Sequence, residues 1–192
     1  MIGSFTGDKY IPAHIEVLKS GLTIPTPARF TPHLRNVNNA LNGTGVLYDA
    51  NGNLIEGEKL ENYAGRLNYN CWVWLNAGFP KGTGFLGLNL ATITGLDEED
   101  KPIIKVAPLE DCLKKDGWAD LGSLNNQGLP TKRAPVDKYE PGKTIYFYSP
   151  RQDAVARFDA GSGRAVFSCY GNPFCRGGSL VVFTSAEGSP EK

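Results

Sequence analysis

The segment FPKGTGFLGLNL, residues 79–90, determines how the strands on its two sides can meet. It alternates like a β-strand, but three glycines and a lysine interrupt the alternation. Glycine weakens the interior of a strand and usually marks a bulge, a bend or a close approach of another group. We interpret residues 80–84 as a turn with Lys81 at its tip, and Gly84 or Gly87 as the bend that closes a small barrel.

Short β-branched and aromatic runs extend from this segment in both directions, and turn residues bound each of them. Because 23 glycines and 13 prolines separate these runs, the chain is predicted to be mainly β. The Asn51-Gly52 pair predicts a tight turn, and DAGSGR at residues 159–164 predicts a hairpin. The expected strands cover residues 14–24, 45–49, 66–76, 84–96, 103–108, 143–149, 154–160, 164–170 and 179–185.

One short helix is expected, at residues 108–118, where a proline and two acids precede two lysines and a glycine. The Gly- and Pro-rich stretch that follows predicts a long loop. We therefore expect a β-rich core in residues 1–110 and a short helix with a linker in residues 111–140. Residues 141–192 should add strands that pack on this core or complete it.

The composition is that of an ordinary globular chain, with 192 residues of which 41% are hydrophobic. Twenty basic and twenty acidic residues balance, so a site for a polyanion must be a local cluster of Lys and Arg. No apolar run approaches the length of about 20 residues that a membrane-spanning helix needs, and the first residues do not resemble a signal peptide. We expect a cytoplasmic protein.

The sequence contains no catalytic motif such as a Gly-x-Ser-x-Gly elbow, a P-loop or a His-Glu-x-x-His site. The segment GTGFLG at residues 82–87 matches the dinucleotide fingerprint in form, but a predicted strand follows it where the fingerprint needs a helix. The acidic run at residues 97–100 follows a predicted strand and is typical of a solvated turn. We therefore expect no enzyme activity, no cofactor and no metal.

The four cysteines form no Cys-x-x-Cys pair and have no zinc-ligand spacing. Cys71, between Asn70 and Trp72, is predicted to be a small buried hydrophobe. Cys169 and Cys175 flank the turn YGNPF, which could bring them within disulfide distance in an oxidising compartment.

Aromatic and basic residues are interleaved along the predicted strands. In RLNYNCWVWLNAGFPK, residues 66–81, period-two alternation places Trp72 and Trp74 on one face with three asparagines, which indicates a wet surface. Single-stranded nucleic acid binds to such surfaces, where bases stack on rings and cations contact phosphates. The alternative is that the tryptophans pack beneath the C-terminal part or against a second subunit.

A second cluster of this kind lies in SCYGNPFCRGG, residues 168–178. Its aromatic residues and arginine could clamp a strand of nucleic acid or dock a protein. The alternative is a β-hairpin in which the Tyr and Phe rings have only a packing role. The candidate nucleic-acid-binding residues from both clusters and their neighbours are Arg66, Tyr69, Trp72, Trp74, Phe79, Lys81, Lys105, Tyr170, Phe174 and Arg176.

Three segments in succession resemble the single-stranded DNA-binding proteins of tailed phages, an OB-fold family. GVLYDANGNLI is similar to the family's apolar run, aspartate and polar turn, and NYAGRLNYNCWVWLN to its Tyr-Ala-Gly followed by a long strand. KGTGFLGLNLATITGLDEE is similar to its Lys-Gly and Gly-Leu-Asn strand that ends in an acidic turn. The resemblance spans residues 45–98, and its matching positions are Tyr63, Gly65, Lys81, Gly82, Gly87, Leu88 and Asn89.

This resemblance implies an OB-fold-like, partly open β-barrel in residues 1–110, with an additional C-terminal β-hairpin region. It also implies a non-catalytic protein that binds single-stranded DNA without sequence preference, in phage DNA replication or recombination in the host cytoplasm. A homodimer is a further expectation, since an exposed aromatic strand can be a dimer seam. The alternative function is a structural β-domain of a virion, as in a decoration, tail or capsid-associated protein.

Overall fold

A computed structural model describes residues 2–5, 9–49, 51–161, 163–173 and 180–183 of the chain. The described residues contain three α-helices, a 3₁₀ turn and nine strands. In chain order these are β1 (Ile2–Phe5), α1 (Tyr10–Lys19), α2 (Pro27–Leu41), α3 (Gly57–Tyr69), β2 (Cys71–Gly78), η1 (Phe85–Gly87), β3 (Asn89–Leu96), β4 (Pro102–Pro108), β5 (Gly117–Asp120), β6 (Thr144–Tyr148), β7 (Val155–Gly161), β8 (Arg164–Gly171) and β9 (Leu180–Phe183).

The fold is mainly β, as predicted. Seven strands form one mixed sheet in the order β4-β3-β2-β7-β8-β6-β5, and β1 pairs with β9 in a separate two-stranded sheet. All neighbours in the large sheet are antiparallel except β6 and β8. The sheet does not close on itself, so the expected OB-fold barrel is not confirmed.

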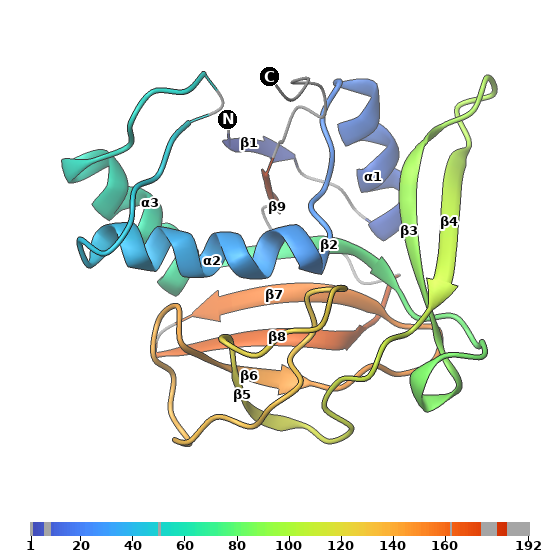
Figure 1. Cartoon of the computed structure of the whole chain (residues 1–192). Helices are drawn as coiled ribbons and strands as arrows, with labels where there is room; N and C mark the ends of the chain where they lie inside the picture. Colours follow the sequence, from blue (N-terminus) through green and yellow to red (C-terminus); the bar gives the residue numbers. More distant parts are fainter. Residues whose placement is uncertain (1, 6–8, 50, 162, 174–179, 184–192) are drawn as a thin grey trace, which may run out of the picture.

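The sheet combines strands from distant parts of the chain. β2 pairs with β7 from Cys71↔Ala160 to Trp74↔Arg157, and β7 and β8 form the hairpin predicted at residues 159–164. β3 and β4 form a two-stranded arm that extends away from the rest of the sheet beside α1 (Figure 1). The predicted strands at residues 103–108, 143–149, 154–160 and 164–170 are confirmed, as is the described part of the strand at 179–185. The strand predicted at residues 84–96 begins only at Asn89, because residues 85–87 form the 3₁₀ turn η1.

The expectation of a single short helix is wrong. Residues 14–24, predicted as a strand, lie largely in α1, and the predicted strand at residues 66–76 begins only at Cys71 because α3 continues to Tyr69. Residues 45–49 form no strand beyond an isolated bridge between Tyr48 and Leu54. In each helix the buried side chains recur every three or four residues, which is the helical period. These side chains are Tyr10, Ala13, His14 and Val17 in α1, Phe30, Leu34, Val37 and Asn38 in α2, and Leu60, Ala64, Leu67 and Asn68 in α3.

The helix predicted at residues 108–118 is also wrong. Its backbone groups bond instead to a neighbouring loop: the Glu110 backbone amide donates to Gln127 Oε1, and the side-chain Nε2 of Gln127 donates to the Pro108 carbonyl. The Leu113 amide donates to the carbonyl of Pro130. These tertiary hydrogen bonds hold the segment extended until β5 begins at Gly117.

The hydrophobic core lies between the sheet and α2 and α3, which cover one face of it (Figure 1). Alternate residues of the central strands, such as Val73, Phe158 and Phe167, pack there against Leu34 and Leu67.

Cys71 is part of this core, as predicted, and Cys112 and Cys169 are buried too. Burial raises the pKa of Cys71 and Cys112 to about 12, so both thiols stay protonated at neutral pH. Cys175, and with it the suggested Cys169–Cys175 pair, lies outside the described residues.

The glycine-rich segment at residues 79–90 is a tight connection rather than the closing bend of a barrel. The Gly82 amide donates to the Gly87 carbonyl, and Gly87 has a φ of 70°, a conformation that favours glycine. Gly84 lies against the backbone of Leu109 so closely that a Cβ atom would be 2.1 Å from the Leu109 nitrogen. The glycines therefore allow close backbone approach where β2 turns into β3.

Two further predictions concern turns. Gly52 has a φ of 81° and its amide donates to the Asp49 carbonyl, so the Asn51-Gly52 turn is confirmed. The acidic run at residues 97–100 is the turn between β3 and β4. Asp97 accepts hydrogen bonds from the Glu99 and Lys101 amides, as in a solvated Asx turn. No helix within the described ranges is both long enough and apolar enough to span a membrane.

Candidate nucleic-acid interface

The sheet face opposite α2 and α3 is lined by aromatic and basic side chains. Residues paired across neighbouring strands point to the same face, so the pairs of Trp74 with Arg157, Arg157 with Ser168, and Ser168 with Tyr148 form one row across four strands. A second row lies on the same face, offset from the first row by two residues in each shared strand. It crosses from β2 to β5 and consists of Trp72, Asp159, Val166, Tyr146 and Trp118.

Helix α1 covers the β2 end of this face. Trp74 is only 1% exposed, and the Tyr10 ring packs edge-to-face against it at 5.7 Å between centroids. Asn76 is buried as well, and its side-chain amide bonds to both backbone groups of Ile93. The predicted wet surface is therefore wrong for Trp74 and Asn76. Trp72 stays partly exposed, with its ring centroid 4.7 Å from that of Trp74.

The other end of the face presents a continuous line of partly exposed rings. Trp118 on β5 contacts Tyr146 at 5.5 Å between centroids, Tyr146 contacts Tyr148 at 5.0 Å, and Tyr148 contacts Tyr170 of β8 at 4.8 Å. All three contacts are edge-to-face, with interplanar angles of 84°, 62° and 87°. We call these four residues the ring line. Each ring fixes the orientation of the next, so the surface is preorganised.

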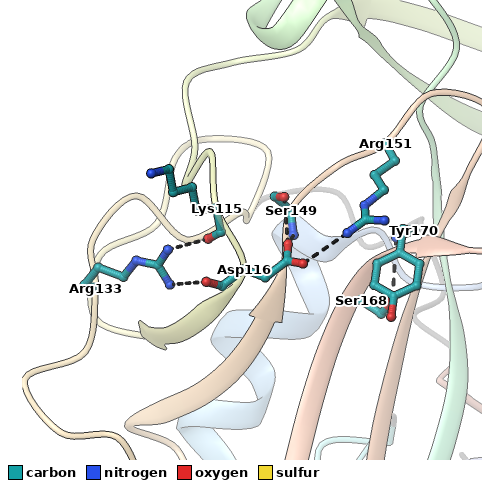
Figure 2. Close-up of polar contacts among 7 residues, drawn as sticks. All are labelled: Lys115, Asp116, Arg133, Ser149, Arg151, Ser168 and Tyr170. Carbon is teal, nitrogen blue, oxygen red and sulfur yellow. Dashed lines mark hydrogen bonds and ion pairs between the residues drawn. The ribbon is translucent and has the colours of Figure 1, made fainter.

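Two arginines flank the ring line. The Arg151 guanidinium lies 4.5 Å from the Tyr170 ring centroid, in a cation–π contact, and donates a hydrogen bond to Asp116 (Figure 2). Arg157 lies between Trp74 and Ser168 in the first row. Its Nε is buried and has no hydrogen-bond partner among the described residues. The residue as a whole is partly exposed on this face.

Asp116 anchors the loop that carries Arg151. Its Oδ1 accepts hydrogen bonds from the Ser149 amide at 2.9 Å and the Ser149 hydroxyl at 2.8 Å, and its Oδ2 accepts from Arg151 at 3.1 Å (Figure 2). Partial burial acts to raise the pKa of Asp116, but these hydrogen bonds and the Arg151 charge outweigh it and hold the pKa below its usual range. The carboxylate is therefore ionised at neutral pH and holds Arg151 beside Tyr170.

Arg133 braces the start of β5 from the opposite side. Its guanidinium donates to the carbonyl oxygens of Lys115 at 2.6 Å and Asp116 at 2.8 Å (Figure 2). Gly117, with a φ of 143°, makes room for it, because a Cβ there would lie 2.1 Å from an Arg133 nitrogen. These bonds position the strand that carries Trp118.

The structure separates most of the predicted site residues. Tyr170 belongs to the ring line and Trp72 lies on the same face. Phe79, 1% exposed, belongs to the core, so its ring offers no face to a base. Phe174 and Arg176 lie outside the described residues. The remaining predicted residues are exposed but scattered over other elements: Arg66 and Tyr69 on α3, Lys81 after β2, and Lys105 on β4.

Sequence reasoning missed Trp118, Tyr146, Tyr148, Arg151 and Arg157. The strand KTIYFYS contained a usable signal, because period-two alternation places Tyr146 and Tyr148 on the face opposite Phe147. Trp118 gave no such signal, since its segment was predicted to be helical. Only the strand order brings the three rings to Tyr170.

In comparisons with known proteins, no family model, no curated protein and no solved structure matches the chain. Within the described part of the chain, no group of three or more His, Cys, Asp or Glu side chains is arranged to hold a metal ion. The inference of function therefore rests on the aromatic and basic face.

Proposed function

We propose that the protein binds single-stranded nucleic acid, with DNA as the expected form, on the open end of the sheet face. Bases would stack on the ring line, and Arg151 and Arg157 would contact phosphates. The observation that carries the proposal is the uninterrupted line of four edge-to-face rings beside two arginines. This site replaces the surface that we expected around Trp74.

The proposal needs no closed barrel. A row of aromatic rings on an open sheet can stack bases as an OB-fold groove does, because stacking uses the exposed ring faces and not sheet closure. Asp159 and Asp116 lie on or beside the same face, which limits the number of phosphates that it can neutralise. Binding should therefore depend more on stacking than on charge.

The proposed role is non-catalytic, without sequence readout, in phage-type DNA replication or recombination in the cytoplasm. The resemblance to tailed-phage single-stranded DNA-binding proteins supports this role, because Tyr63, Lys81, Gly87 and Asn89 follow that family's order. The alternative, a structural β-domain of a virion, would place the protein in the particle and predicts no affinity for single strands.

Fluorescence anisotropy with a fluorescein-labelled thymidine oligonucleotide tests the proposal. We expect the protein to bind at low salt, and Tyr148→Leu to weaken binding about tenfold, because each stacked base contributes about 1–3 kcal/mol. A plot of log K against log salt should have a slope of about −1.4, or about −0.7 for each phosphate contacted by Arg151 and Arg157. Arg157→Gln should remove about half of that slope.

Matched controls come from residues away from this face. Tyr48→Leu replaces an exposed tyrosine in the loop between α2 and α3, and Arg66→Gln replaces an exposed arginine on α3, which covers the opposite face of the sheet. Both variants should bind like the unmodified protein, and so should Lys105→Gln. The proposal is wrong if the protein produces no anisotropy change at low salt, or if Tyr148→Leu and Tyr48→Leu bind equally well. Recovery of the protein in purified particles, without affinity for the oligonucleotide, would favour the virion alternative.

A further inference from the structure

A cavity of about 610 Å³ lies on the other side of the sheet, between the C-terminal halves of α2 and α3 and residues 139–143. Its volume is in the range of pockets that hold small organic molecules. Gly142, with a φ of 73°, packs so tightly on Asn38 that a Cβ would lie 2.6 Å from the Asn38 Cβ. The wall of the cavity is therefore held against α2.

Two buried asparagines form the floor. Asn38 is 3% exposed and Asn68 is 1% exposed, and each side-chain amide donates to the other's oxygen, at 3.2 and 2.8 Å. Asn38 uses its second amide hydrogen on the Leu34 carbonyl, and the Tyr139 hydroxyl donates to Asn68 Oδ1. Burial raises the pKa of Tyr139, so this hydroxyl stays protonated and remains a donor at neutral pH.

The floor has hydrogen-bonding capacity left over. Asn68 Nδ2 has two hydrogens, and only one of them has a partner among the described residues. Asn38 Oδ1 accepts one hydrogen bond and can accept another. The donor and the acceptor are bonded to each other, and each keeps one further hydrogen-bonding position beside the other. They match a ligand in which an N–H group is adjacent to a carbonyl oxygen.

The rim adds an aromatic ring and a balance of charges. Tyr69 is 53% exposed and makes no ring contact with another described residue, so its ring can stack on a planar ligand. Glu61, Glu140 and Lys143 lie at the rim, and Glu140 forms an ion pair with Lys138 at 3.0 Å. The charges around the opening therefore balance, so it attracts neither anions nor cations strongly. Gly65 of α3 also lines the cavity, and a Cβ there would meet nothing within 4 Å.

From this geometry we infer that the cavity binds an uncharged nucleobase with an amide edge, such as thymine. The base N3–H would donate to Asn38 Oδ1, a base carbonyl would accept from Asn68 Nδ2, and the ring would stack on Tyr69. The base can belong to a free nucleoside or to a nucleic-acid strand. The inference goes beyond the proposed DNA surface, since the cavity and the ring line share no residue.

Saturation-transfer NMR with thymidine tests the inference. We expect saturation of the base protons, and no binding of 3-methylthymidine, because its N3-methyl group cannot donate to Asn38 Oδ1 and would occupy the position of that hydrogen bond. Gly65→Leu should weaken thymidine binding about tenfold or more by filling the cavity, and Tyr69→Ala should weaken it about tenfold through lost stacking. Lys59→Leu is the matched control, because Lys59 is exposed on α3 and does not line the cavity.

Two further experiments test whether the bound base comes from a free nucleoside or from a strand, and whether the cavity binds independently of the ring line. Tyr148→Leu should bind thymidine normally. Displacement of thymidine from that variant by a thymidine oligonucleotide would show that bases of a strand enter the cavity, and retention would identify the free nucleoside as the ligand. The inference is overturned if the unmodified protein gives no base-proton saturation, if 3-methylthymidine binds as well as thymidine, or if Gly65→Leu binds like Lys59→Leu.

Discussion

Acidification to about pH 4.5 should lower the free energy of unfolding by about 3 kcal/mol through His14 alone. His14 is 1% exposed, its ring lies 4.5 Å from that of Tyr10, and its Nε2 has no hydrogen-bond partner within the described residues. Burial lowers the pKa of His14 from 6.5 to about 3. The unfolded chain therefore gains a proton below pH 6.5 that the folded protein does not accept, and stability present above pH 6.5 is lost as the pH falls toward 3.

Urea denaturation at a series of pH values measures this effect, and His14→Phe isolates it. The variant keeps a ring beside Tyr10 but has nothing to titrate at position 14, so between pH 6.5 and about 4.5 its stability should fall by about 3 kcal/mol less than that of the unmodified protein. Two other groups act on both proteins alike. Burial also lowers the pKa of His33, and protonation of Asp116 weakens its bonds only at lower pH. Parallel pH profiles of the two proteins between pH 6.5 and about 4.5 would contradict the role of His14.

The substitution Gly84→Ala should lower the free energy of unfolding by about 3 kcal/mol. An added Cβ would lie 2.1 Å from the Leu109 nitrogen and 2.5 Å from the Leu88 oxygen. Both are backbone atoms that cannot rotate away, so the connection before β3 must separate from the segment after β4. The hydrogen bonds from the Phe85 amide to Leu109 and from the Leu109 amide to Leu88 would be strained or broken.

The midpoint and slope of a urea transition measure this loss, with Gly65→Ala as the control. Gly65 lies in α3, where an added Cβ meets nothing within 4 Å, so alanine there should stabilise the protein by about 0.5–1 kcal/mol. The two variants make the same chemical change with opposite expected signs. An unchanged midpoint for Gly84→Ala would show that the close approach of Gly84 to Leu109 does not limit stability.

The strands of the C-terminal half were predictable because their signals are local. Residues 154–160 and 164–170 alternate between buried and outward positions and are joined by a Gly-containing turn, which predicts a hairpin without other information. The helices were missed for an identifiable reason. In α1, the β-branched residues Ile15 and Val17 resemble a strand face, while the true signal is the three- and four-residue spacing from Tyr10 to Val17.

The sequence predicted an aromatic and basic face, but not most of the residues that form the candidate site. Period-two alternation placed Trp72 and Trp74 on one face of β2, but no local pattern shows that α1 covers Trp74 while Trp72 stays partly exposed. Tyr170 was identified beside an arginine, yet its contacts are Tyr148 and Arg151, which come from another strand and the loop after it. The cavity floor was not predicted, because Asn68 was assigned to a strand and Asn38 to no element.

The sequence by itself determined the hairpin of β7 and β8 and the Asn51-Gly52 turn, because alternation and turn chemistry act between residues close in the chain. Only the tertiary structure decided the strand order, the open sheet and the surface that remains exposed. Exposure of a ring depends on which distant element packs on it, and α1 packs over β2 but leaves β6 and β5 uncovered. Trp74 therefore became core, while Trp118, Tyr146 and Tyr148 became the candidate binding surface.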